Sequence, residues 1–124
     1  MAYEFAGQRV SLTAAADLSD KQFYVVYVAS ADSVNVATDK TAHVPLGILQ
    51  NDPESGQAAH VAISGISKAV AGGSFSAGDL LTFDSQGRVV SVGGSTGLYT
   101  IGIAQKAASA AGEVVPVLIR VFEV

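Results

Sequence analysis

The apolar residues of this chain fall into short runs separated by Gly, Asp, Asn and Ser, a pattern typical of β proteins. The run FYVVYVA, from Phe23 to Ala29, predicts a strand buried on both faces. In HVAISGISKAV, Val61 and Ile63 alternate with His60 and Ala62, which predicts a strand with two different faces. The last run, VVPVLIRVFEV, predicts a final strand whose proline lies at an edge or bulge, because proline cannot donate to a ladder.

One hairpin is predicted by its turn residues. The apolar runs DLLTF and RVVSV flank the sequence DSQG. Asp84 at the first position and Gly87 at the fourth fit a type I turn, and Gly87 is free to adopt positive φ. We therefore expect Leu80–Phe83 to pair antiparallel with Arg88–Val92.

A second pattern is a unit that the chain spells twice, as GILQNDPESGQ from Gly47 and as GIAQKAASAAGE from Gly102. Each copy begins with Gly-Ile-X-Gln, reaches a second glycine and enters a valine-rich run. The repetition predicts two equivalent hairpins in which Ile48 and Ile103 both point into the core. Two such hairpins can close a small barrel, and closure removes exposed strand edges.

The segments between the repeated glycines are expected to be loops, or at most one helical turn. AQKAASAAG contains good helix formers. Its counterpart LQNDPESG carries Pro53 in the middle, which a regular helix does not tolerate. If the two units are equivalent, neither segment is a helix.

The first twenty residues differ from the rest because they have little apolar periodicity. The stretch LTAAADLSD is compatible with an arm, with a first strand, or with a short helix capped near Asp17 or Ser19. We expect residues 1–20 to form an N-terminal arm or first strand, and residues 21–124 to form one β-rich domain. The predicted fold is mainly β, a small single-domain barrel or sandwich built from hairpins.

Composition and charge exclude several classes of protein. The absence of cysteine excludes disulfides, thiolate metal sites and cysteine nucleophiles. The net charge is −4 and the basic residues are scattered, which argues against binding to nucleic acid. No apolar run approaches the roughly 20 residues that cross a bilayer, so we expect no membrane partner. Only 15% of residues are charged, which fits either a β protein rich in small residues or a surface covered by another protein.

No arrangement of residues predicts catalysis, a metal or a cofactor. His43 and His60 have no acid or second histidine at ligand spacing, and no Gly-X-Ser-X-Gly elbow occurs. The stretch from Gly73 to Asp79 has the glycine spacing of a phosphate loop but lacks the following Lys and Ser or Thr. The stretch from Asn51 to Gly56 lacks the alternating ligands of a calcium loop. We predict that the protein is not an enzyme.

Three segments carry a resemblance to a known family: PLGILQNDPESGQAAHVAISGISKAVAGG, FSAGDLLTFDSQGRVV and IGIAQKAASAAGEVVPVLI. They extend over Pro45 to Ile119. In the order of their turns and apolar runs, they resemble the small capsid decoration, or cement, proteins of tailed bacteriophages.

The resemblance implies a β-rich protein that binds the outer capsid surface of the virion and stabilises it against internal DNA pressure. The implied partners are the major capsid protein and further copies of the chain, with a trimer favoured, and synthesis is expected in the host cytoplasm. Tyr3, Phe5, Val10 and Leu12 are predicted to contact the capsid or a neighbouring subunit. The alternative is a β-barrel module of a virion that binds a receptor or a carbohydrate. The absence of Trp and the presence of only four Tyr argue against a sugar site.

Overall fold

The structure is a computed structural model that describes the backbone of residues 5–124 and the side chains of residues 7–124. These residues form eleven strands and no helix, which confirms the mainly β fold and the loops expected around Pro53 and in AQKAASAAG. The strands are β1 (Phe5–Ala6), β2 (Arg9–Ala14), β3 (Val25–Ser30), β4 (Ser33–Val36), β5 (Pro45–Leu49), β6 (Ala58–Ala62), β7 (Gly65–Val70), β8 (Leu80–Phe83), β9 (Val89–Ser91), β10 (Gly102–Ala104) and β11 (Val114–Ile119).

Strands β2 to β6 form a closed barrel in the order β2-β4-β3-β5-β6, here called the first barrel. Its interior is filled by small and medium-sized apolar side chains, as expected for five short strands. The buried ones are Ala14, Leu18, Val26, Val34, Leu49, Ala59 and Val61. Because β2 pairs with both β6 and β4, residues 9–14 complete the barrel.

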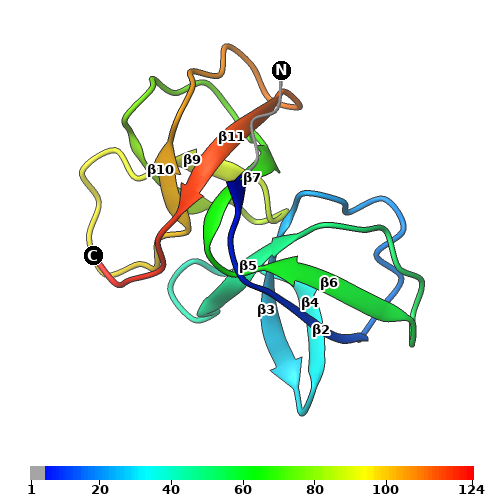
Figure 1. The fold of residues 1–124 in the computed structure, drawn as a ribbon. Helices are drawn as coiled ribbons and strands as arrows, with labels where there is room; N and C mark the ends of the chain where they lie inside the picture. The colour runs from blue at the N-terminus through cyan, green and yellow to red at the C-terminus, as the bar shows by residue number, and fades with distance from the viewer. Residues whose placement is uncertain (1–4) are drawn as a thin grey trace.

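The remaining strands form a second sheet in the order β1-β7-β11-β10-β8-β9. Figure 1 shows it in the upper left, with the first barrel below it and to the right. Apart from β1, the order matches that of the first barrel, with β7, β8, β9, β10 and β11 in place of β2, β3, β4, β5 and β6. An isolated parallel bridge between Ala71 and Val89 repeats the parallel pairing of Ala14 with Val34. The second sheet is therefore a second copy of the barrel.

The hairpins of the repeated unit are equivalent, as predicted, but they belong to different sheets and do not close one barrel together. Ile48 lies opposite Ala62, and Ile103 lies opposite Leu118, its counterpart. Beyond each pair, the Gln50 N–H donates to His60 O at 2.7 Å. The Gln105 N–H donates in the same way to the carbonyl of Pro116, at 3.0 Å.

The first glycine of each unit permits a close approach of two strands. A Cβ on Gly47 would lie 2.0 Å from the carbonyl oxygen of Ala62, and one on Gly102 would lie 2.2 Å from that of Leu118. Neither distance allows a side chain. The second glycine of each unit, Gly56 or Gly112, has a φ of +85° or +92°, which L side chains rarely adopt.

The prediction that both isoleucines point into a core is correct for Ile48, which is fully buried, and wrong for Ile103, which is only partly buried. Ile48 points out of the first barrel and is covered by the second sheet, as part of one cluster with Phe83 and Ile101. The same outward face of the second sheet has no such cover within the described chain. The repeat alone could not show this difference.

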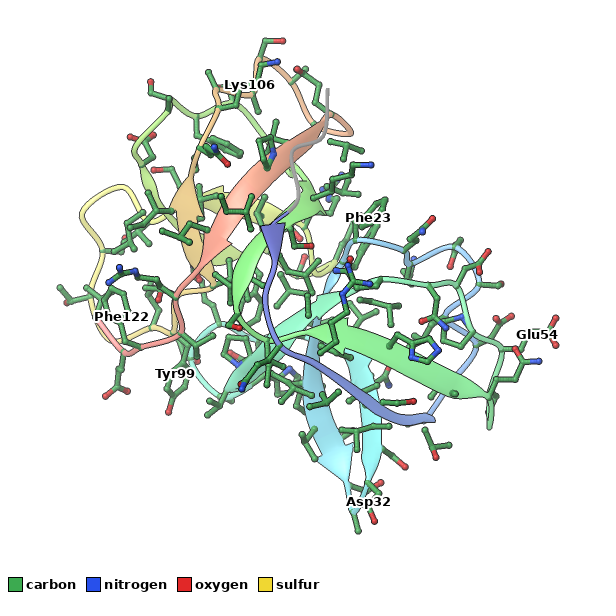
Figure 2. All side chains as sticks on the ribbon, in the orientation of Figure 1. Phe23, Asp32, Glu54, Tyr99, Lys106 and Phe122 are labelled. Carbon is green, nitrogen blue, oxygen red and sulfur yellow. The ribbon has the colours of Figure 1, made fainter. Side chains whose placement is uncertain are left out.

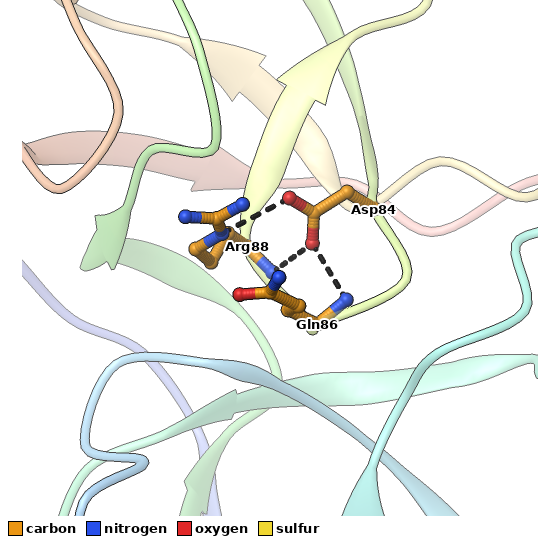
Figure 3. A network of polar contacts seen from close by, with 3 residues as sticks. All are labelled: Asp84, Gln86 and Arg88. Atoms are coloured by element: carbon orange, nitrogen blue, oxygen red, sulfur yellow. Dashed lines mark hydrogen bonds and ion pairs between the residues drawn. The ribbon is translucent and has the colours of Figure 1, made fainter.

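The predicted β8–β9 hairpin is confirmed, with Phe83 opposite Val89. The Gly87 N–H donates to Asp84 O across the turn at 3.2 Å, and Gly87 has a φ of +82°. The Asp84 carboxylate accepts the backbone N–H groups of Gln86 and Arg88, each at 2.9 Å, and the Arg88 Nε at 3.0 Å (Figure 3). One aspartate side chain thus closes the turn.

Other strand predictions need correction. HVAISGISKAV contributes to two strands, not one. The first strand ends at Ala62, and the chain changes direction before the next strand begins at Gly65, where φ is +82°. Pro116 lies on β11, which is paired on both sides, and not at an edge or bulge. Its carbonyl accepts the Gln105 N–H just past the end of β10, so the N–H that proline lacks falls at the end of that ladder and not in its middle. In β3, burial holds for Val25 and Val26, whereas Val28 is 49% exposed.

The two barrels are joined by a short segment, Phe23–Val25, which we call the inner edge. The Phe23 carbonyl accepts the Val70 N–H at 3.1 Å, and the Val25 N–H donates to Gly87 O at 2.8 Å. The inner edge thus lies between β7 and the β8–β9 turn. In the first barrel the same corner is closed directly by Thr13 N–H and Asp32 O, at 2.9 Å. This insertion separates β7 from the β8–β9 turn at that corner, while Ala71 and Val89 still form a bridge beyond it.

Replacing Gly47 or Gly102 by alanine is expected to lower the free energy of unfolding by about 3 kcal/mol, because the new methyl group would overlap a carbonyl oxygen. Gly73→Ala is the matched control, since a Cβ there meets nothing within 4 Å, and its effect should stay within about 0.5 kcal/mol. Urea unfolding followed by circular dichroism measures all three. Equal stability of the three variants would contradict the close approach.

Deletion of residues 2–16 is expected to unfold the protein, because it removes β2, and with it the closure of the first barrel. A deletion of residues 2–4 leaves β1 and β2 in place and serves as the control. Thermal melts followed by circular dichroism distinguish the two. If the longer deletion melted like the intact chain, residues 2–16 would be an arm and not part of the barrel.

Candidate binding surface

The contact residues predicted from the sequence lie in different surroundings. Tyr3 is outside the described residues, and for Phe5 only the backbone is described, paired with Ile66. Val10 and Leu12 are partly buried and pack on the core of the first barrel. Much of their apolar surface is therefore used within the fold, and a contact with the capsid stays a prediction for all four.

The two histidines have structural surroundings. His43 Nδ1 accepts the backbone N–H groups of Thr38 and Asp39, at 3.1 and 3.3 Å. Its ring stacks on Tyr27 with 3.8 Å between ring centroids. His60 is exposed. Because His43 covers one face of the Tyr27 ring, that face is not free to stack on a sugar.

Three carboxylates at the surface close local turns, and hydrogen bonds stabilise their charged forms. The pKa of Glu113 is lowered by hydrogen bonds from the Ser109 side chain and backbone and from the backbone of Ala110. The pKa of Asp39 is lowered mainly by Thr41, and that of Asp17 by Ser19. The Ser19 N–H donates to the Asp17 carboxylate, and this bond forms a turn in place of the short helix that was one of the predictions for this segment. These groups order loops, and within residues 5–124 no group of three His, Cys, Asp or Glu could hold a metal ion.

An apolar stripe crosses the outward face of the second sheet and is the most extended candidate for a contact surface. Its four members are direct neighbours in the strand registers, so their side chains point to the same side of the sheet. All four are partly exposed to solvent. We call Ile66, Leu118, Ile103 and Leu80 the outer stripe.

A pocket of about 350 Å³ adjoins the outer stripe at Leu80. It lies where the chain leaves β9 and enters a glycine-rich loop. The lining residues are Asp79, Leu80, Ser91, Val92, Gly93, Gly94, Ser95, Thr96 and Val124. Stripe and pocket together offer an apolar surface with polar groups at its rim.

Other apolar areas lie elsewhere on the surface. Val28 and Val44, exposed by 49% and 53%, line a groove of about 420 Å³ on the first barrel. Phe122, in the C-terminal segment, is 45% exposed, and Figure 2 shows it at the left edge of the molecule, away from the Asp32 hairpin tip. Among the described residues, no helix has the length and apolar character needed to cross a membrane.

The sequence analysis did not identify the outer stripe, although a signal was present. The runs DLLTF and VVPVLI are apolar at successive positions, which places large apolar side chains on both faces of β8 and β11. One face is needed for the core. The apolar side chains on the other face are not needed for the core, and they form the outer stripe.

Comparison with solved structures shows a similar fold in a phage protein. The N base of the head fiber gp8.5 of bacteriophage phi29, known from a crystal structure, superposes with a TM-score of 0.70 at 18% sequence identity. The match covers 91% of this chain and 93% of that chain. No curated protein matches the sequence.

The sequence itself matches the phage cement protein family over residues 6–119. This span includes both copies of the barrel, with the outer stripe and the repeated glycine units. It also exceeds the span of the resemblance seen in the sequence, which began at Pro45. The chain belongs to the phage cement protein family.

Proposed function

We propose that this protein binds the outer surface of the assembled phage head, with the major capsid protein as its partner, and stabilises the head against the pressure of the packaged DNA. The observation that carries the proposal is the family match over residues 6–119. The fold shared with a phage head fiber base supports it.

The physical character of the molecule supports the same role. The two barrels pack against each other through a shared core cluster, and only 15% of residues are charged, so the protein is a compact body with extensive low-charge surface. Many weak contacts of this kind become strong when many copies bind one lattice. We also propose that the protein acts as a homo-oligomer, with a trimer favoured, outside the capsid and after synthesis in the host cytoplasm.

The N-terminal residues Tyr3 and Phe5 stay in the proposal as contacts with the capsid or with a neighbouring subunit. Aromatic side chains often carry a large share of the binding energy at an interface. Val10 and Leu12 pack on the first barrel, so only the exposed part of each side chain is proposed to contact the capsid or a neighbouring subunit.

Replacing Tyr3 and Phe5 together by alanine is expected to weaken binding to undecorated heads by at least about tenfold, because both aromatic side chains are removed. Co-sedimentation of purified protein with heads measures the affinity, and a thermal melt checks the fold. Val114→Ala, at a site 51% exposed on β11, is the control and should bind like the intact protein. If the double variant binds normally, these two residues are not contacts. If the intact protein itself does not bind heads, the proposed function is wrong.

A further inference from the structure

The two barrels are copies of each other, so a surface used on one can be compared with its counterpart on the other. The outward face of the first barrel carries Val25, Ile48 and Ala62, which are neighbours in the strand registers. Their exposed fractions are 0%, 0% and 5%, because they belong to the core cluster shared with the second sheet. In the first barrel, this face packs against the second sheet of the same chain.

The counterpart face of the second sheet is the outer stripe. Leu80 takes the place of Val25, Ile103 that of Ile48, and Leu118 that of Ala62. Each of the three is at least as large as the residue it replaces. The face thus keeps the apolar character of a binding surface, but within residues 5–124 it is only partly covered.

The backbone shows the same relation. The counterpart of the inner edge, Phe23–Val25, is the segment Gly78–Leu80, which we call the outer edge. Phe23 and Gly78 both have positive φ, +70° and +88°, and both donate their N–H to the strand beside them, to Leu49 and Ala104 respectively. The two edges therefore share a positive φ at the first residue and the same hydrogen bond to the neighbouring strand.

The two edges differ in what they bind. The inner edge accepts a hydrogen bond at Phe23 O and donates one at Val25 N–H, both to the second sheet. Ala104 N–H donates to Asp79 O, so the Leu80 N–H points away from β10. Within the described chain, the Gly78 carbonyl has no backbone partner. Gly78 is exposed, and the pocket of about 350 Å³ lies beside Leu80, where the Gly87 turn lies beside Val25.

We propose that the outer edge and the outer stripe form the surface that docks on the head shell, where they pair with an open β-edge of a capsid subunit that lies beside an apolar groove. This inference rests on the proposed function, because it takes the head shell as the partner. Main-chain pairing supplies the hydrogen bonds, and the stripe supplies apolar burial, as the inner edge and its face do within the molecule.

A count of edges and openings argues against a second copy as the occupant. Residues 5–124 contain two such edges and one opened corner, and that corner, between β7 and the β8–β9 turn, is already filled by the chain's own inner edge. The corresponding corner of the first barrel is closed by Thr13 and Asp32. A second copy therefore offers the outer edge no opening of this kind, which favours a different protein as the partner.

Hydrogen exchange on the unmodified protein tests this surface without any substitution. When the protein is bound to undecorated heads, the backbone amides in residues 78–82 should exchange at least about tenfold more slowly than in the free protein, because the Leu80 N–H gains a partner and the capsid covers the whole segment. The exposed hairpin tip at residues 30–33 is the internal control and should exchange at an unchanged rate. Protection of the tip without protection of residues 78–82 would overturn the proposal.

Substitutions on one strand give the second arm. Leu118→Lys places a charge in the outer stripe, whereas Val114→Lys places one on the same strand at a site 51% exposed. Leu118→Lys should weaken head binding at least about tenfold and Val114→Lys should not, with both folds checked by thermal melts. The intact protein could bind heads while residues 78–82 stay unprotected and Leu118→Lys binds normally. In that case the outer edge and the outer stripe are not the docking surface, and the proposed function stands. If the intact protein does not bind at all, the proposed function fails, and the partner named here fails with it.

Discussion

The insertion of Phe23–Val25 into the second sheet is the interaction on which the architecture depends. Two hydrogen bonds, from Val70 to Phe23 and from Val25 to Gly87, hold the corner of the second sheet apart. The opened interior then merges with the outward face of the first barrel into one core. If the second barrel were closed, Val25 and Ile48 would be exposed to solvent, because the second sheet could not cover them. The two barrels would then have little apolar contact with each other.

The duplication explains why the two barrels are built alike and why only one of their outward faces is buried. The same glycine contacts and the same strand order recur in both halves, so the strands of the two barrels pack in the same way. Only one of the two outward faces can be buried inside a molecule of two barrels. The other is left as an apolar stripe, which is a poor surface for a free monomer and a suitable one for a protein that works on a lattice.

Local features of the fold could be predicted from the sequence, and long-range ones could not. The prediction of the Asp84–Gly87 hairpin was correct because a turn depends on only four residues. The predicted equivalence of the Gly47 and Gly102 units was correct because at both positions a neighbouring carbonyl leaves no room for a side chain. The second barrel was missed because its strands beyond the repeated unit share too few residues with those of the first barrel, as Leu80 in the place of Val25 illustrates. The burial of Ile48 and the exposure of Ile103 depend on which face the other barrel covers, and no local pattern encodes that. Among candidate site residues, Val10 and Leu12 lie in a barrel strand, whereas the outer stripe became visible only when the strand registers were known.

The central functional claim is that the protein reinforces a filled head. The most direct measurement is the temperature at which DNA is released from filled heads that lack the protein, compared with the same heads after saturation with it, using a fluorescent dye that reports free DNA. Bridging contacts on the outer surface should raise that temperature, and the rise should follow the occupancy of the heads. Heads that are visibly decorated but release their DNA at the same temperature as bare heads would contradict the account.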